Sequence, residues 1–408
     1  MAAVDLTAAA NYLKNRFHPK KLENLSYDGS PLFAMLPKKT DFGGIDLKVP
    51  VSYADLRGRS CNFAVAQANK EGSSTEKFAI TTKKDYALFS VDGQTVKASR
   101  GDLNGWLPSL EKEAESAARA LARSTSWAVY RDSVGSIATM ASDSSTNMTL
   151  GNRADIQNFE VGMTLQLVDP ASTSAARSGK VKVAAVYRDN GVITTNTAVA
   201  TAIAAQADDD LIVPEGDLNN RITGLAGWIA DVASNTSTSI FGVNAQVDDV
   251  RLGGIKFDAS GMNILEAIID ASARAGENGA RPNKMFINFD KWRELCNYLG
   301  STVVRTQGTA YAPAGQPKAD VGYEGIKIHG PSSVIEVYAD RHCQPAKGWM
   351  LQMDTWTLHS TGGVPMLLEE DGQSILREAT DDAYEGRWGA YYQLYCTAPG
   401  YNVRIENL

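Results

Sequence analysis

Residues 107–123 read LPSLEKEAESAARALAR, and this segment sets the architecture predicted for the rest of the chain. Its apolar residues recur at intervals of three and four, which predicts an amphipathic helix from about Leu107 to Asp132, with Gly135 as its stop. At about 1.5 Å per residue, such a helix is roughly 38 Å long. Glu115 precedes Arg119 by one turn, so the two should form an ion pair. The face expected to pack consists of Ala114, Ala117, Ala118 and Leu121.

The composition is that of a globular protein, because 43% of the 408 residues are hydrophobic and 21% are charged. The net charge of -7 is unevenly distributed: residues 1–142 hold 19 Lys and Arg against 15 Asp and Glu, and the remainder holds 21 against 32. This asymmetry indicates an N-terminal third that faces a polyanion. The four cysteines form no CxxC pair, which predicts neither a zinc site nor a disulfide framework. No apolar run is long enough to span a membrane.

Residues 1–44 predict an extended arm and not a packed domain. Residues 4–17 have the apolar spacing of a short amphipathic helix, and Pro19, Pro31 and Pro37 interrupt the segment that follows. The arm carries basic residues that are candidates for contact with a polyanion: Lys14, Arg16, Lys20 and Lys21.

Residues 45–100 predict a long β-hairpin. Residues 45–51 alternate apolar and polar side chains, and residues 78–93 form a second strand-like run. A polar, turn-rich segment at 66–74 separates the two runs and carries almost no large apolar side chains. Because an isolated two-stranded ribbon is marginally stable in water, the hairpin must lie on another surface.

Residues 143–217 predict a separate β module, either a barrel or a sandwich. Polar segments at 142–147 and 215–220 flank it, and Asp189-Asn190-Gly191 signals a tight turn. Ten acidic and five basic residues give the module a net charge of -5. Its strand candidates are residues 159–168, 180–187, 192–195 and 211–213.

Residues 254–365 mix helix and strand signals. Asp258 or Ser260 can cap a helix that ends at Ala275, and Asn288 can cap a second helix over residues 289–299. Short strands are predicted at 284–288, 325–329, 333–338 and 348–353, and further strands within 387–406.

No catalytic, metal-binding or cofactor-binding motif is recognisable. The sequence contains no phosphate-binding loop, GxGxxG, HExxH or GxSxG. His359 and Ser360 lie just beyond Asp354, but adjacent residues of a strand point to opposite faces, so a catalytic triad is not expected. The sequence therefore predicts a protein that is not an enzyme and uses no cofactor.

The order of these parts resembles the major capsid protein of tailed bacteriophages, the Hong Kong 97-type shell fold. That family follows an N-arm, an E-loop hairpin and a spine helix with peripheral and axial domains. Local motifs are similar as well: RPNKMFIN at 281–288, GIKI at 325–328, VYAD at 337–340 and GWML at 348–351. The β module departs from the minimal plan and looks like an accessory insertion.

The resemblance implies an α+β fold and a division of the chain into seven parts. These are the N-arm at 1–44, the E-loop at 45–100, the spine helix of the peripheral domain at 101–142, the inserted β module at 143–217, a return to the peripheral domain at 218–253, the axial domain at 254–365, and C-terminal strands at 366–408.

The function implied is a homo-oligomeric icosahedral shell of hexamers and pentamers around double-stranded DNA. The implied partners are a separate scaffolding protein, a portal protein and a decoration protein. The implied location is the virion, and the host cytoplasm during assembly. Contacts between neighbouring subunits are then expected from the E-loop residues Lys70, Glu71, Lys77, Lys83 and Lys84.

Two alternatives remain at this stage. An encapsulin-like bacterial compartment would share the fold and enclose an enzyme in place of DNA. A multidomain enzyme with a β accessory domain would be a different class of protein, and the missing catalytic motifs argue against it.

Overall fold

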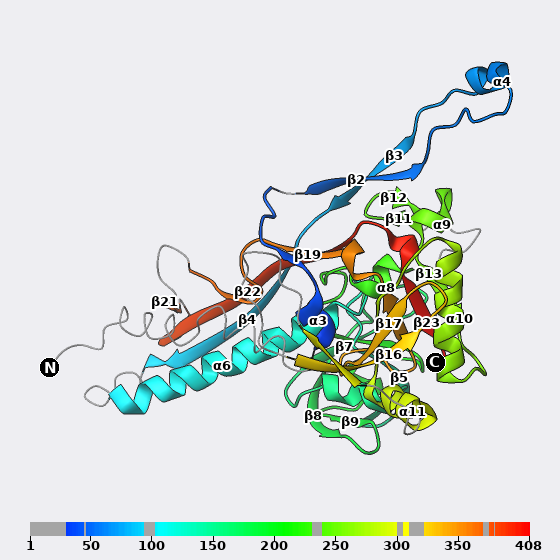
Figure 1. Cartoon of the computed structure of the whole chain (residues 1–408). Helices are drawn as coiled ribbons and strands as arrows, with labels where there is room; N and C mark the ends of the chain where they lie inside the picture. Colours follow the sequence, from blue (N-terminus) through cyan, green and yellow to red (C-terminus); the bar gives the residue numbers. More distant parts are fainter. Residues whose placement is uncertain are drawn as a thin grey trace.

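The computed structural model describes residues 30–44, 46–93, 103–230, 239–299, 305–309, 322–369, 375–378 and 380–408. The described part is a mixed α+β structure, with a body and two projections (Figure 1). One projection is a hairpin that ends in the short helix α4, and the other is a wing built from α6, β4 and β22. No helix within the described ranges is long and apolar enough to cross a membrane.

The described end of the predicted arm is packed, which differs from the expectation. Helix α3 (Pro31–Met35) is buried throughout, and the buried Asp340 carboxylate accepts a hydrogen bond from the Leu32 N–H at 3.3 Å. The reason is that α3 carries apolar side chains on every face and therefore needs surroundings that are apolar on all sides. Residues 1–29 lie outside the described ranges.

The wing places α6 (Leu103–Ala128) against a six-stranded sheet. Its longest strands, β4 (Lys83–Asp92) and β22 (Ala383–Cys396), pair antiparallel. The remaining strands of this sheet are β1 (Lys38–Lys39), β19 (Trp356–Ser360), β20 (Met366–Leu367) and β21 (Ile375–Arg377). The sheet thus joins the N-terminal third of the chain to its C-terminal strands.

Helix α6 confirms the predicted long helix but ends before its predicted stop. The chain that returns from the β module approaches the helix end, where the Leu225 N–H donates to the Val129 carbonyl at 2.7 Å. A Cβ atom on Gly224 would lie 2.3 Å from that carbonyl oxygen, so only glycine permits this approach. Gly135, the predicted stop, lies with φ +79° in the loop beyond.

The β module is a closed six-stranded barrel that begins earlier than predicted. The polar segment at 142–147, expected as a flank, forms part of the first hairpin of the barrel. The predicted strands at 180–187, 192–195 and 211–213 are confirmed, with the tight turn at Gly191, whose φ is +62°, whereas the strand predicted at 159–168 covers only residues 164–168. The barrel comprises β5 (Ala138–Ser144), β6 (Asn147–Leu150), β7 (Thr164–Val168), β8 (Val181–Tyr187), β9 (Val192–Thr195) and β10 (Leu211–Pro214), with η1 (Arg153–Asn158) and α7 (Val199–Ala202) between strands.

A seven-stranded sheet forms the other end of the body, in the order β13-β23-β18-β14-β17-β16-β15. Its strands are β13 (Ile255–Asp258), β14 (Lys284–Ile287), β15 (Arg305–Thr309), β16 (Gly322–His329), β17 (Val334–Ala339), β18 (Gly348–Leu351) and β23 (Val403–Glu406). The helices are α10 (Ile264–Glu277) and α11 (Phe289–Leu299). The Asn288 side chain caps α11 as predicted, but α10 begins after Asn263 and not at Asp258 or Ser260.

Short elements connect the wing and the seven-stranded sheet. They are α8 (Leu225–Trp228), β11 (Ser239–Ile240), β12 (Val243–Asn244), η2 (Ala245–Val247), α9 (Asp249–Leu252), η4 (Met353–Thr355) and η5 (Pro399–Tyr401). Trp228 in α8 is fully buried between rings of three other segments: Phe78 at 5.2 Å, Phe241 at 5.0 Å and Tyr395 at 6.1 Å.

Candidate assembly surfaces

The hairpin consists of β2 (Leu47–Ala54) and β3 (Ser74–Ile80), with α4 (Phe63–Ala68) at its tip (Figure 1). No residue from 46 to 77 is buried. Local polar contacts hold the tip instead: the Asn62 side chain accepts a hydrogen bond from the Ala64 N–H at 3.0 Å, and an ion pair joins Arg57 to Glu71 at 3.3 Å. The base of the hairpin belongs to the core, because Phe78 and Ile80 are buried and Leu47, Val49, Val51 and Tyr53 pack against the same cluster. The distal part, residues 54–73, adds no buried side chain to it.

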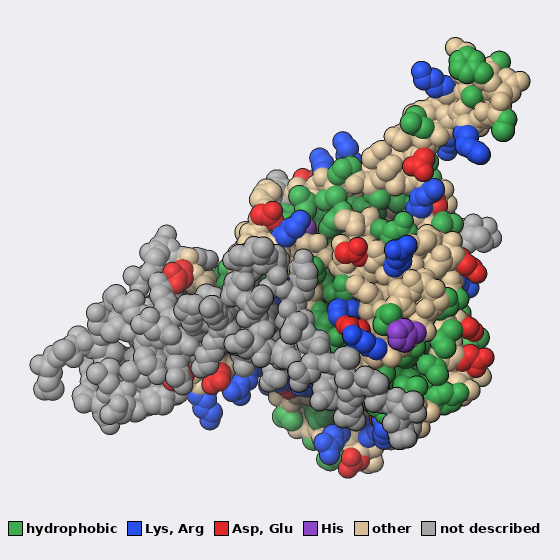
Figure 2. Space-filling model, in the orientation of Figure 1, with side chains coloured by type: hydrophobic (Ala, Val, Ile, Leu, Met, Phe, Trp, Pro, Cys, Tyr) green, Lys and Arg blue, Asp and Glu red, His purple; other side chains and the backbone are tan. Residues whose placement is uncertain are grey.

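Three large apolar side chains are exposed at the hairpin tip. Figure 2 shows hydrophobic side chains at this tip beside Lys and Arg side chains. The exposed fractions are 74% for Leu56, 80% for Phe63 and 45% for Val65. Sequence reasoning missed them because it placed the tip at residues 66–74. The signal was available, since Asn62 before FAVAQA is an N-cap before a short helical segment.

The five charged residues expected on the hairpin divide into two groups. Lys70, Glu71 and Lys77 are exposed on it. Lys83 and Lys84 lie instead on β4, opposite Tyr392 and Tyr391 of β22, so their predicted place on the hairpin is wrong. The Lys83 Nζ donates to the Asn219 carbonyl at 3.0 Å.

Helix α6 meets the sheet through small residues. Ala114, Ala118 and Leu121 are buried and Ala117 is partly buried against the same core. The indole N–H of Trp388 in β22 donates to the Ala114 carbonyl at 3.0 Å. The basic residues expected on the arm lie outside the described part of the chain: Lys14, Arg16, Lys20 and Lys21.

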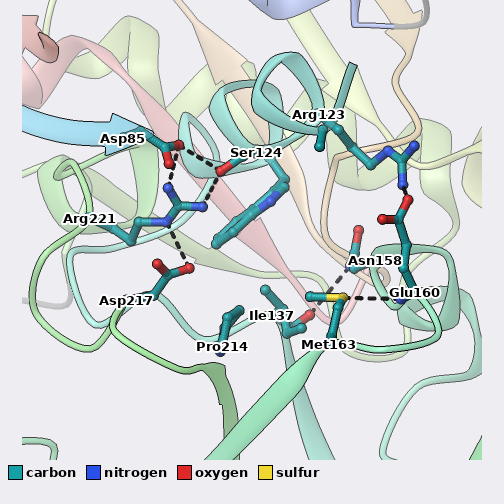
Figure 3. A pocket seen from close by; sticks show the side chains of 12 residues that line it. Asp85, Arg123, Ser124, Ile137, Asn158, Glu160, Met163, Pro214, Asp217 and Arg221 are labelled. Atoms are coloured by element: carbon teal, nitrogen blue, oxygen red, sulfur yellow. Dashed lines mark hydrogen bonds and ion pairs between the residues drawn. The ribbon is translucent and has the colours of Figure 1, made fainter. Parts of the chain in front are cut away.

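A cavity of about 270 Å³ lies between α6 and the barrel (Figure 3). On one wall, the Arg221 guanidinium forms ion pairs with Asp85 of β4 and with Asp217, the latter at 3.2 Å. It also lies 4.5 Å from the ring centroid of Trp127, while Ser124 donates to Asp85 at 2.6 Å. This network links the segment after the barrel, which contains Asp217 and Arg221, to α6 and to β4 of the six-stranded sheet.

Burial is the main cause that raises the pKa of Asp217 to about 6; the charge of Arg221 opposes the shift and that of Asp85 adds to it. One carboxyl of this network is therefore partly protonated near neutral pH.

No group of three or more His, Cys, Asp or Glu side chains that could hold a metal ion occurs among the described residues. His359 lies 3.6 Å from Asp41, and the Ser360 hydroxyl donates to the Gly362 carbonyl at 2.8 Å. These partners leave no arrangement of His359 and Ser360 that could activate a nucleophile.

Comparison with known proteins identifies the fold. No family model and no curated protein sequence matches the chain. The solved asymmetric unit of the cyanophage A-1(L) capsid is 11% identical, covers 93% of this chain and 91% of its own, and has a TM-score of 0.51. The chain has the phage capsid-protein fold.

Two further structures align with lower scores. The capsid of a native GTA particle is 10% identical, over 92% of this chain and 89% of its own, with a TM-score of 0.45; the virus-like particle from Pyrococcus furiosus is 11% identical, over 96% and 99%, with a TM-score of 0.42.

Proposed function

We propose that this chain is the major capsid subunit of a tailed phage, which assembles as hexamers and pentamers into an icosahedral shell around double-stranded DNA. The observation that carries the proposal is the hairpin, because no residue from 46 to 77 is buried while Leu56, Phe63 and Val65 are exposed at its end. The distal part of this hairpin, residues 54–73, costs conformational entropy on ordering and adds no buried side chain to the core.

A neighbouring copy of the chain would supply the missing contacts. Full burial of a large apolar side chain contributes roughly 1.5–3 kcal/mol, so burial of the three tip residues can hold one tip with a few kcal/mol. Each contact is weak, but every subunit of a shell repeats it, and linked weak contacts sum to a cooperative assembly. Lys70, Glu71 and Lys77 on the ribbon would add polar contacts at the rim.

The charge distribution supports an orientation for the subunit. The basic arm residues Lys14, Arg16, Lys20 and Lys21 would face the packaged DNA and contact phosphates without sequence preference. The barrel, with a net charge of -5 over residues 143–217, would face outward, since DNA repels an acidic surface. A separate scaffolding protein, a portal protein and a decoration protein are the partners that such a shell would use.

The test separates assembly from folding. A variant with Leu56→Ser and Phe63→Ser should keep the circular dichroism spectrum of the parent but form no closed shells in electron micrographs. Val161→Ser is the matched control, because Val161 is also exposed, at 68%, but lies on the barrel. Shells that form normally from the tip variant would overturn the role of the tip. Failure of both variants would indicate a general effect of apolar surface instead.

The contents of purified shells distinguish the encapsulin-like alternative. Nuclease-protected double-stranded DNA is expected inside shells produced during infection. A cargo enzyme in place of DNA would reassign the protein to a bacterial compartment of the same fold.

A further inference from the structure

The contact between the barrel and the wing, here called the joint, encloses a cavity. Residues of α6 and β4 line one side of it, and residues of the barrel and of the segment after the barrel line the other (Figure 3). Protein interiors rarely contain voids larger than a water molecule, and a polar cavity of about 270 Å³ holds several waters. The joint is therefore not close-packed, and it leaves space in which the barrel can move.

Two polar links cross the cavity. The outer link joins Arg123 of α6 to Glu160 of the barrel, and these side chains are 34% and 50% exposed. Exposed ion pairs contribute little to stability, so this link cannot hold the barrel alone. The inner link is the Arg221 guanidinium, which is almost fully buried and pairs with Asp85 of β4 and with Asp217. The inner link is therefore the stronger of the two.

The end of α6 supplies a separate attachment for the barrel. Arg131 pairs with Asp155 of η1 at 3.2 Å, and both side chains are largely buried. The Arg131 guanidinium also donates to the Ser136 carbonyl at 2.7 Å, just before the first barrel strand. A barrel that is held here and released at the Arg221 network would turn about the end of α6.

Asp217 is the less well satisfied carboxylate of the inner link. Asp85 accepts hydrogen bonds from Arg221 and from Ser124, the latter at 2.6 Å. Within the described ranges, the Asp217 carboxylate has one charged partner, the Arg221 Nε at 3.2 Å, on the guanidinium that also serves Asp85. An ionised carboxylate in this position is stabilised by contact with water, whereas the protonated group has less need of it.

The other titratable groups around the joint do not balance the charge of Asp217. Arg123 and Glu160 face the same cavity but pair with each other. On β4, the Lys83 ammonium donates to a backbone carbonyl at 3.0 Å. On β22, the buried Tyr392 keeps its hydroxyl proton, because burial raises the pKa of that group. Asp217 thus has no second counter-charge among the described residues.

The closed joint consequently favours the protonated form of Asp217. Burial is the main cause that raises its pKa to about 6, against 3.8 ordinarily, with Arg221 opposing the shift and Asp85 adding to it. A group that binds its proton more tightly in a closed state than in an open, hydrated state shifts the equilibrium toward the open state as pH rises between the two pKa values.

We propose that the barrel is mounted on the wing by a pH-operated joint, which is closed when Asp217 carries a proton and opens about the end of α6, admitting water to the cavity, when Asp217 is ionised. The joint lies within one subunit and does not depend on the proposed shell.

Spin labels on the two sides of the joint measure its opening in the full-length chain. Ser116→Cys on α6 and Arg188→Cys on the barrel carry the labels, because both positions are exposed, and the accessible native thiols are removed by Cys61→Ser and Cys296→Ala. The labelled chain is diluted into unlabelled chain, so that only distances within one subunit are measured. Pulsed electron paramagnetic resonance should show one narrow distance distribution at about pH 4.5. A second distance should gain about twentyfold in population by about pH 7, as follows from a pKa of about 6 in the closed state and 3.8 in the open state.

Two variants assign the response to Asp217. Asp217→Asn cannot ionise and should keep the distribution of pH 4.5 at both pH values. Asp208→Asn is the matched control, because Asp208 is an exposed acid of the barrel that does not line the cavity, and it should respond as the parent does. Circular dichroism at both pH values shows that each variant is folded. A distribution in the parent that does not change with pH would overturn the proposal, and so would equal responses of Asp217→Asn and Asp208→Asn.

Discussion

Substitution of Ala118 by glutamate tests how the wing is held together. Ala118 is fully buried in α6, in the same hydrophobic cluster as Phe89 of β4 and Trp388 of β22. A glutamate at this position would place a carboxyl group among apolar side chains. The exposed Ser116 lies on the same helix, so Ser116→Glu introduces the same side chain into water and serves as the control.

The cost follows from the protonation state of the new carboxyl group. A buried carboxylate without a partner takes up a proton. Protonation of a glutamate with an ordinary pKa of about 4.3 at about pH 7 costs roughly 4 kcal/mol of folding free energy, at 1.36 kcal/mol per pKa unit. Additional volume in a packed contact adds to this figure. Ser116→Glu should change stability by no more than about 0.5 kcal/mol, as exposed substitutions do.

Amide hydrogen exchange along α6 measures the difference directly. A loss of roughly 4 kcal/mol should accelerate exchange of the protected α6 amides by several hundredfold in Ala118→Glu and leave Ser116→Glu close to the parent. If α6 stayed equally protected in Ala118→Glu, the helix face buried against the sheet would not be the one that contains Ala118. If both variants lost protection equally, the effect would come from charge on the helix and not from burial.

Two further predictions concern the barrel and its attachment. Asp217 has a pKa of about 6 in the folded chain against 3.8 ordinarily, so it binds its proton more tightly when folded, and its contribution to stability is lost as pH rises through about 6. Asp217→Asn should therefore stabilise the chain at about pH 8, by at most about 3 kcal/mol, and flatten the dependence of the urea midpoint on pH between about pH 4 and 6; a steeper dependence would contradict this reasoning. Because β5 begins at Ala138, a fragment of residues 136–217 should give a β-rich spectrum with a cooperative melt, whereas residues 145–216, which lack β5, should not. Cooperative melting of both fragments would show that β5 is dispensable.

The sequence predicts elements well where one face of each is buried and one is exposed. The long helix, the strand around 334–339 and the helix after Asn288 have this property, and the structure confirms them. The run at 78–93 was predicted as a single strand and is two. Phe78 and Ile80 are buried at even positions, whereas Phe89 and Val91 are buried at odd positions. A single strand cannot change the face it buries without a break, and the break falls between β3 and β4.

The start of the barrel was missed for a different reason. Ser142, Asp143, Ser144 and Asn147 have the composition of a loop, and Met140 and Met148 are the buried residues that mark the hairpin as strands. Short strands of a closed barrel expose polar side chains on the outer face, so composition alone cannot separate them from a linker. What makes them strands is pairing with β9 and β10, residues far along the chain.

Residues of the candidate surfaces could be predicted from the sequence only where their packing partner belongs to the same chain. Ala114 and Ala118 could be placed on a packing face because the partner surface belongs to the same chain. Phe63 gave no comparable pattern, because under the proposed function its contact belongs to a second copy, and such a contact imposes no periodicity on a six-residue helix. Residues of this kind are found by asking which exposed apolar groups and which buried charges the fold leaves unexplained.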